Sequence, residues 1–139
     1  SLPPLYIAYD TRLSETTEIF HNDIQGRFAR GEPDILEAMA EWAALASECR
    51  DLLSQSKGNE IGPLLNRNFD LRKSVYRISE GNLAMIEAAR DAGASAKFTG
   101  SGGAIVGVYE GEEMFERLTT NLAPLGVKVF KPTIEPEIP

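Results

Sequence analysis

Apolar residues between positions 35 and 53 recur at alternating gaps of four and three residues. This spacing places them on one face of an α-helix. The members of the face are Ile35, Met39, Trp42, Ala46, Cys49 and Leu53. Asp34 and Glu37 resemble a capping box at the helix start, with Asp in the place of the usual Ser or Thr. We therefore predict a helix over 35–56 whose apolar face, Trp42 and Cys49 included, lies in the core.

A second apolar stripe follows Gly58 and contains one polar residue. Within residues 59–79 its apolar members are Ile61, Leu64, Leu71, Val75 and Ile78, and Pro63 fits the first turn of a helix. Asn68 occupies the position between Leu64 and Leu71. A buried amide must find hydrogen-bond partners or destabilise the fold by a few kcal/mol. Asn68 is therefore either an amide satisfied by the backbone or a functional residue.

The remaining pattern predicts strands and helices that alternate toward the end of the chain. Strands are expected over 5–10, 95–100, 104–110 and 127–130, and further helices over 17–30, 81–94 and 112–126. The order β-α-α-α-α-β-β-α-β indicates an α+β fold in a single domain over residues 1–139. Its C-terminal part fits a ferredoxin-like split βαβ unit, so we expect an antiparallel sheet with extra helices inserted early.

Composition narrows the class of partner. A chain of 139 residues is the size of one domain, and its net charge of −7 argues against nucleic acid or an anionic membrane as the main partner. No apolar run approaches the roughly 18 residues of a membrane span. One Cys and one His argue against a disulfide framework and a zinc site. No signal peptide is found at the start, and the lone Cys fits a reducing compartment, so we expect a cytoplasmic protein.

Four glycines gather in the stretch "ASAKFTGSGGAIVGVY" over 94–109, which raises the question of a phosphate-binding loop. A dinucleotide-binding turn would need a glycine where Ile105 stands, and a Walker loop would need Lys after its last glycine, where Ala104 stands. Two interpretations remain. The glycines either supply positive φ in a hairpin, or form a nest of backbone N–H groups that approaches an anion or another phosphate loop.

The segment "AKFTGSGGAIVG" (96–107) resembles the third conserved motif of the GHMP kinases, and "AARDAGAS" (88–95) fits the helix that precedes it in that family. Ala104 stands where many members carry another glycine. Together with "LNRNFDLRKSVY" (65–76) and "LPPLYIAYD" (2–10), the chain is most similar to the C-terminal domain of the glucuronokinases, with kinases of heptose phosphates as the alternative. The resemblance extends over about residues 5–131.

The resemblance implies transfer of the γ-phosphoryl group of Mg–ATP to a sugar hydroxyl, here of a uronic acid or a related sugar. The implied nucleotide-binding residues are Lys97, Thr99, Gly100, Ser101, Gly102 and Gly103, and the implied acceptor-binding residues are Asn68, Asp70 and Arg72. The family's phosphate loop and acidic magnesium-binding residues lie in an N-terminal domain that is not found in this chain. We therefore expect no catalytic or metal-binding residue here.

The first predicted strand begins almost at the start of the chain, so we expect the chain to be part of a longer kinase. We expect this part alone to be inactive, and tight binding of ATP and Mg²⁺ to require the intact enzyme. Its expected partners are the N-terminal kinase domain and a second copy of itself. Lys97, Asp70 and Arg72 have a simpler interpretation as solvated charges, and Thr99 as a backbone partner. The rival hypothesis is a free-standing ferredoxin-like module that binds a small ligand or a partner without catalysis.

Overall fold

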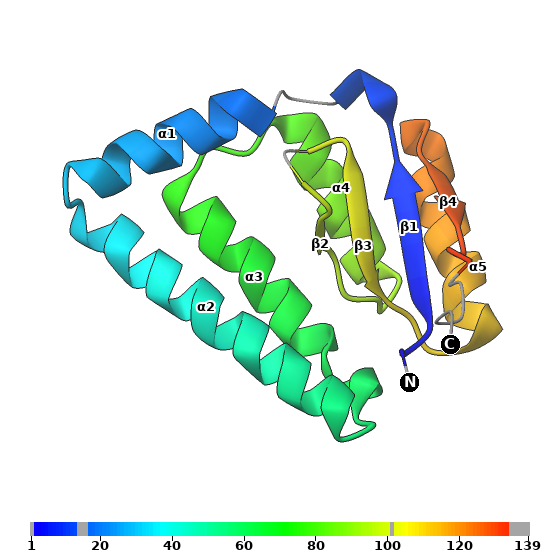
Figure 1. The fold of residues 1–139 in the computed structure, drawn as a ribbon. Helices are drawn as coiled ribbons and strands as arrows, with labels where there is room; N and C mark the ends of the chain where they lie inside the picture. Colours follow the sequence, from blue (N-terminus) through cyan, green and yellow to red (C-terminus); the bar gives the residue numbers. More distant parts are fainter. Residues whose placement is uncertain (1, 14–16, 101, 134–139) are drawn as a thin grey trace.

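The structure is a computed structural model and describes residues 2–13, 17–100 and 102–133. Its centre is an antiparallel sheet in which the strand order is β2-β3-β1-β4 (Figure 1). The strands are β1 (Leu5–Tyr9), β2 (Lys97–Phe98), β3 (Ala104–Val108) and β4 (Lys128–Phe130). The first strand lies between the last two, which is the ferredoxin-like order. The predicted α+β fold with a ferredoxin-like sheet is confirmed.

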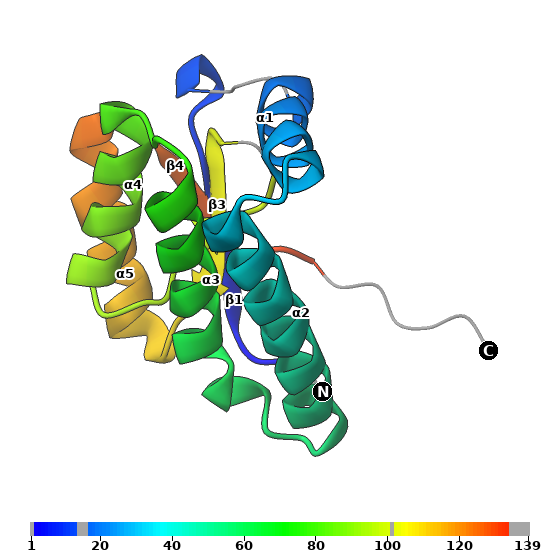
Figure 2. The ribbon, with the colours of Figure 1, turned by 90° about the vertical axis from the view of Figure 1, so that its left-hand side faces the viewer.

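The helices divide into two groups around this sheet. Helices α4 (Glu80–Asp91) and α5 (Gly111–Leu122) cover one face, whereas α3 (Gly62–Val75) lies beside the edge strand β2 and α2 (Pro33–Ser54) packs outside α3 (Figures 1 and 2). Helix α1 (Thr17–Ala29) contacts α2. Short 3₁₀ turns occupy Thr11–Leu13, Gly58–Glu60 and Ala123–Leu125. None of the described helices is long and apolar enough to cross a membrane.

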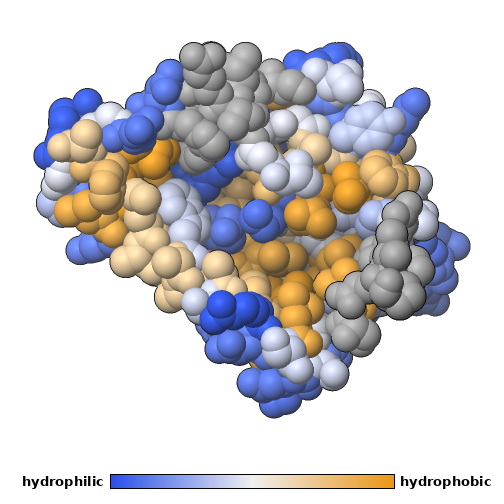
Figure 3. Space-filling view, viewed as in Figure 1, coloured by the Kyte–Doolittle hydropathy of each residue, from blue (hydrophilic) through white to orange (hydrophobic). Residues whose placement is uncertain are grey.

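The two faces of the sheet differ in exposure. The core lies under the face covered by α4 and α5, and its largest fully buried side chains in that cluster are Tyr6, Phe69, Met85, Ile86, Ile105, Leu118 and Leu122. On the opposite face, Ile7 pairs with Val106 on one side and with Phe130 on the other. Phe130 and Tyr9 are among the exposed large apolar residues, and Figure 3 shows apolar surface over this part of the molecule.

A close crossing of two segments explains one of the glycines. A Cβ atom at Gly107 would lie 1.7 Å from the carbonyl oxygen of Ser95. The same carbonyl accepts a hydrogen bond of 2.6 Å from the buried Tyr6 hydroxyl. Burial raises the pKa of Tyr6 well above its ordinary value, against a weaker opposing effect of Arg90. Gly107 thus serves packing inside the fold, not the hairpin loop.

Two details predicted for α2 are wrong. The helix begins at Pro33 after Glu32, so Asp34 lies in its first turn and no side chain caps the helix. The Asp34 carboxylate instead pairs with Arg27 at 2.9 Å. The buried seam also lies one residue from the predicted stripe, because Ala38 and Leu45 are buried whereas Met39 and Ala46 are exposed. Alanines flank the true seam, so the apolar pattern did not distinguish these neighbouring faces.

Three residues of α2 and α3 that the apolar stripes predicted to be buried, Asn68, Trp42 and Cys49, are only partly buried. Asn68 is half-buried, and its backbone carbonyl, not its side chain, accepts a hydrogen bond of 3.2 Å from the indole of Trp42. Trp42 and Cys49 are themselves half-buried. Burial, reinforced by Glu48, raises the pKa of the Cys49 thiol above its ordinary value. The polar residue that the helix buries is Arg72.

Candidate functional site

The glycine-rich segment forms the loop of the β2–β3 hairpin. The Thr99 N–H donates to the Ala104 carbonyl at 3.0 Å and closes the loop at its base. Gly102 and Gly103 have φ angles of +138° and +80°, which side-chain-bearing residues rarely adopt. Ser101, which we expected to bind the nucleotide, lies outside the described residues. The predicted hairpin with positive-φ glycines is therefore present.

Asn82 holds this loop from the inside. Its side chain lies in the first turn of α4 and the residue is only 3% exposed. The amide oxygen accepts a hydrogen bond of 2.9 Å from the Gly103 N–H, and the amide nitrogen donates to the Ser79 hydroxyl at 2.9 Å and to the Leu13 carbonyl at 3.2 Å. One buried amide thus joins the hairpin, the start of α4 and the turn after β1.

The end of β1 holds the loop from a second side. The Asp10 N–H donates to the Gly103 carbonyl at 2.7 Å. The Asp10 carboxylate is bound by the Arg12 guanidinium through hydrogen bonds of 2.9 and 2.7 Å. These bonds to Arg12 hold the pKa of Asp10 below its ordinary value, against a smaller effect of desolvation. Both backbone polar groups of Gly103 are therefore satisfied within the protein.

Arg72 holds the loop from a third side. Its guanidinium donates to the Gly100 carbonyl at 2.6 Å and lies over the Phe98 ring, with 4.8 Å between the guanidinium carbon and the ring centroid. Phe98 in turn meets Phe69 of α3 edge to face at a centroid distance of 5.3 Å. These contacts give Arg72 a positioning role at the hairpin that its place on a helix did not reveal.

One glycine of the loop faces open space. Gly100 is exposed, and a Cβ atom built on it would meet no atom within 4 Å. The amide N–H groups of Gly100 and Gly102 make no hydrogen bond to another described residue. Exposed backbone N–H groups in a turn are suited to phosphate oxygens. In the described part of the chain, no three His, Cys, Asp or Glu side chains gather to bind a metal ion.

The other sequence-predicted residues lie in different surroundings. Lys97 is half-buried, and burial, with the nearby Arg72 as a second cause, lowers its pKa below the ordinary value. Asp70 is exposed and pairs with Arg90 of α4 at 2.9 Å. Asn68 faces α2 through its backbone contact with Trp42. The contacts found for Asn68 and Asp70 thus do not place them at the hairpin with Arg72.

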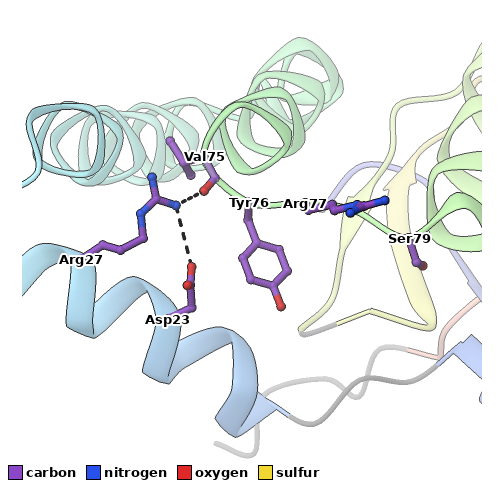
Figure 4. Close-up of a pocket in the computed structure, with 6 residues that line it drawn as sticks. All are labelled: Asp23, Arg27, Val75, Tyr76, Arg77 and Ser79. Atoms are coloured by element: carbon purple, nitrogen blue, oxygen red, sulfur yellow. Dashed lines mark hydrogen bonds and ion pairs between the residues drawn. The ribbon is translucent and has the colours of Figure 1, made fainter.

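A cleft of about 620 Å³ lies between α1 and the segment that joins α3 to α4. It is lined by Asp23, Arg27, Val75, Tyr76, Arg77 and Ser79. Figure 4 shows Asp23 and Arg27 projecting from α1 on one side, with Arg77 and Ser79 on the other. Ser79 links the cleft to the hairpin, because its hydroxyl accepts from Asn82, which itself accepts from Gly103. Arg72 and Asn82 therefore flank a segment whose middle lines the cleft.

Our sequence interpretation missed Asn82 and Arg77. Asn82 precedes Met85, Ile86 and Ala89 on the buried face of α4, so it is a polar residue at the start of an apolar stripe, much as Asn68 is a polar residue within one. The same signal was therefore available. Arg77 follows the end of α3 in a connecting segment and carries no such signal. Only the tertiary arrangement places it in a cleft.

Comparison with known proteins identifies the family. The family description "GHMP kinases C terminal" matches residues 49–123, which is more than half of the chain. The chain belongs to the GHMP kinases. In this GHMP kinase domain, the hairpin held by Asn82 and Arg72 lies within the matched residues. The matched region also includes α3, α4 and the whole cleft-lining segment between them.

Two curated relatives are similar over most of the chain. Over 108 residues, or 76% of the chain, it is 42% identical to "Probable glucuronokinase 2" and 36% identical to "Glucuronokinase 1", both of Arabidopsis thaliana. This GHMP kinase chain spans only 29% and 30% of the length of these relatives. Mevalonate kinase of L. major superposes on 97% of the chain, and 44% of its own length is covered, with a TM-score of 0.81 at 17% identity. That likeness concerns the fold.

Proposed function

We propose that this chain is the C-terminal domain of an ATP-dependent kinase that transfers a phosphoryl group to a hydroxyl of a uronic acid. The similarity to two proteins named as glucuronokinases supports this substrate class. Because the chain spans less than a third of those relatives, we assign the phosphate loop and the magnesium-binding acids to an N-terminal domain of the full-length protein. ATP and Mg²⁺ would then bind between the two parts.

The observation that carries the proposal is the construction of the hairpin. Asn82, Asp10 and Arg72 fix its inner side, while its outer side at Gly100 bears no side chain. A rigid, bare loop lets another glycine loop and the nucleotide phosphates approach the backbone closely. Phosphoryl transfer depends mostly on positioning and electrostatic stabilisation. We assign the Gly100 and Gly102 N–H groups to phosphate oxygens.

The adjoining cleft would take the sugar. Its six lining residues are mainly polar, and it shares the segment between Arg72 and Asn82 with the hairpin. In this arrangement Arg72 acts by holding the Gly100 carbonyl and does not contact the sugar. Lys97 and Thr99 support the hairpin strands. Asn68 and Asp70, which the resemblance implied for the acceptor, are not part of this proposed cleft.

Substitution of Gly100 by Ala tests the role of the loop. Gly100 does not have a left-handed φ and its Cβ would meet open space, so we expect the free energy of unfolding to change by no more than about 0.5 kcal/mol. In the full-length protein, however, the methyl group would intrude where phosphates approach. We expect kcat/KM for ATP, with glucuronate as acceptor, to fall by on the order of 100-fold. Unchanged kinetics would leave the loop a simple hairpin turn.

Gly102→Ala is a poorer probe of the same question. Gly102 has a φ of +138°, and its Cβ would lie 3.1 Å from the Asn82 amide nitrogen, so stability and activity would fall together.

The rival binding-module hypothesis is tested by the wild type alone. If the full-length protein turns over ATP with neither uronic acids nor heptose phosphates, the kinase proposal is wrong. Turnover of heptose phosphates alone would favour the alternative substrate class.

A further inference from the structure

The cleft beside the hairpin has an acidic side and a basic side. On the α1 side, Arg27 pairs with Glu32 at 3.1 Å and with Asp34 at 2.9 Å, and lies 3.8 Å from Asp23. One guanidinium is thus shared among three carboxylates, and it also donates to the Val75 carbonyl. Glu32 also pairs with Arg30 at 3.0 Å, so three carboxylates meet two guanidinium groups here and the cluster keeps an excess of negative charge. Among the residues that line this side of the cleft, Asp23 presents carboxylate oxygens, which accept hydrogen bonds.

The opposite side carries Arg77. It is exposed to solvent at the cleft, and no hydrogen bond or ion pair links it to another described residue. Figure 4 shows it on the far side of the Tyr76 ring from Asp23 and Arg27. The neighbouring Ser79 caps α4, so the positive end of that helix dipole adds to the field on this side. Among the described lining residues, Arg77 is the cation without a compensating carboxylate.

We propose that Arg77 binds the carboxylate of the uronic acid and selects this substrate over neutral sugars; the inference rests on the proposed function. A uronic acid combines one carboxylate with several hydroxyl donors, which matches a cleft with one uncompensated guanidinium and one acidic side. The carboxylate lies against Arg77 and Ser79, and hydroxyl groups face Asp23. The planar guanidinium forms paired hydrogen bonds with a carboxylate, which a lysine does not reproduce.

The test uses the full-length protein and two acceptors that differ in one group. These are D-glucuronate and D-glucuronamide, in which an uncharged amide replaces the carboxylate. We expect Arg77→Gln to lower kcat/KM for glucuronate by about 10- to 100-fold, as expected for a lost charge-assisted hydrogen bond. The variant should keep KM for ATP and kcat/KM for glucuronamide within about twofold of the wild-type values. Its melting temperature should stay within about one degree of wild type. Arg77→Lys should recover part of the loss in kcat/KM for glucuronate. Arg50→Gln, which replaces an exposed arginine of α2, should leave kcat/KM for both acceptors unchanged.

A binding measurement separates the two proposals. Calorimetric titration of glucuronate into wild type and Arg77→Gln, without ATP, should show weaker binding in the variant by a similar factor. If the wild type binds glucuronate through Arg77 but does not phosphorylate it, the proposed function fails and the Arg77 assignment stands. If the wild type phosphorylates glucuronate and Arg77→Gln binds and phosphorylates it equally well, the assignment is overturned. An equal loss with glucuronamide would also overturn it, because the effect would not depend on the carboxylate.

Discussion

Substitution of Asn82 by Ala tests whether one buried amide holds the glycine hairpin in place. The change removes three hydrogen bonds, to Gly103, Ser79 and Leu13. A typical intramolecular hydrogen bond contributes about 0.5–1.5 kcal/mol, and an unpaired buried donor costs about 1–3 kcal/mol. The Gly103 N–H is buried and would lose its partner, whereas Ser79 is exposed and can bind water. We therefore expect a loss of about 3 kcal/mol in the free energy of unfolding.

Urea unfolding followed by circular dichroism measures this loss, since the free energy falls linearly with denaturant. In thermal unfolding the same loss corresponds to a melting temperature lower by roughly 10 °C for a domain of this size. Asn121→Ala is the matched control. Asn121 lies half-buried on α5, and its side chain makes one hydrogen bond within the described residues, of 3.1 Å, to the Ala88 carbonyl. Its removal should cost about 1 kcal/mol.

The reasoning would be refuted if Asn82→Ala were no more destabilising than Asn121→Ala. That result would mean that water replaces the amide at the hairpin, and that the loop needs no anchor inside the fold. In the full-length protein, Asn82→Ala should also lower kcat/KM for ATP at a temperature where the variant remains folded. Its hairpin would have lost one of the contacts that fix Gly103, while the Asp10 contact remains.

Two further predictions concern the crossing beneath β3. Gly107→Ala should abolish folding or lower the free energy of unfolding by more than about 4 kcal/mol, because its Cβ would overlap the Ser95 carbonyl. The control, Gly26→Ala in α1, should raise the free energy of unfolding by up to about 1 kcal/mol. Soluble yield and urea unfolding distinguish the two variants. Tyr6→Phe should cost about 1–2 kcal/mol near neutral pH through the lost bond to Ser95, and the gap from wild type should narrow above about pH 10. Above this pH the Tyr6 hydroxyl loses its proton in the unfolded state but keeps it in the folded state, where its pKa is raised. The unfolded state then binds fewer protons, so the stability of the wild type falls as the pH rises. A difference in stability between wild type and Tyr6→Phe that is constant with pH would contradict this.

The order of the elements could be predicted from the sequence, because it depends on local periodicity. The β-rich runs over 5–10 and 104–110 and the helical stripes between them were enough to predict the ferredoxin-like sheet that the structure shows. The glycine loop was also recognisable, because positive φ at Gly102 and Gly103 demands glycine regardless of what surrounds it. Such constraints act within a few residues and leave a readable trace in the chain.

The contacts that build the candidate site were decided only by the tertiary structure. Asn82 meets Gly103 across 21 residues of sequence, and Arg72 meets Gly100 across 28. The sequence pattern directed attention to Asn68 because it interrupts an apolar stripe, yet α3 turns Arg72 toward the core and leaves Asn68 half-buried. Which face of a helix is buried depends on the neighbours against which it packs.

The same reason applies to the cleft. Asp23, Arg27 and Arg77 come from α1 and from the segment after α3, and nothing in their spacing relates them. A side chain acquires its charge environment from residues brought together by the sheet and its inserted helices. The sequence by itself therefore determined the fold and the hairpin, through local backbone preference and apolar periodicity. The anchoring of the hairpin and the polarity of the cleft beside it were decided by long-range packing.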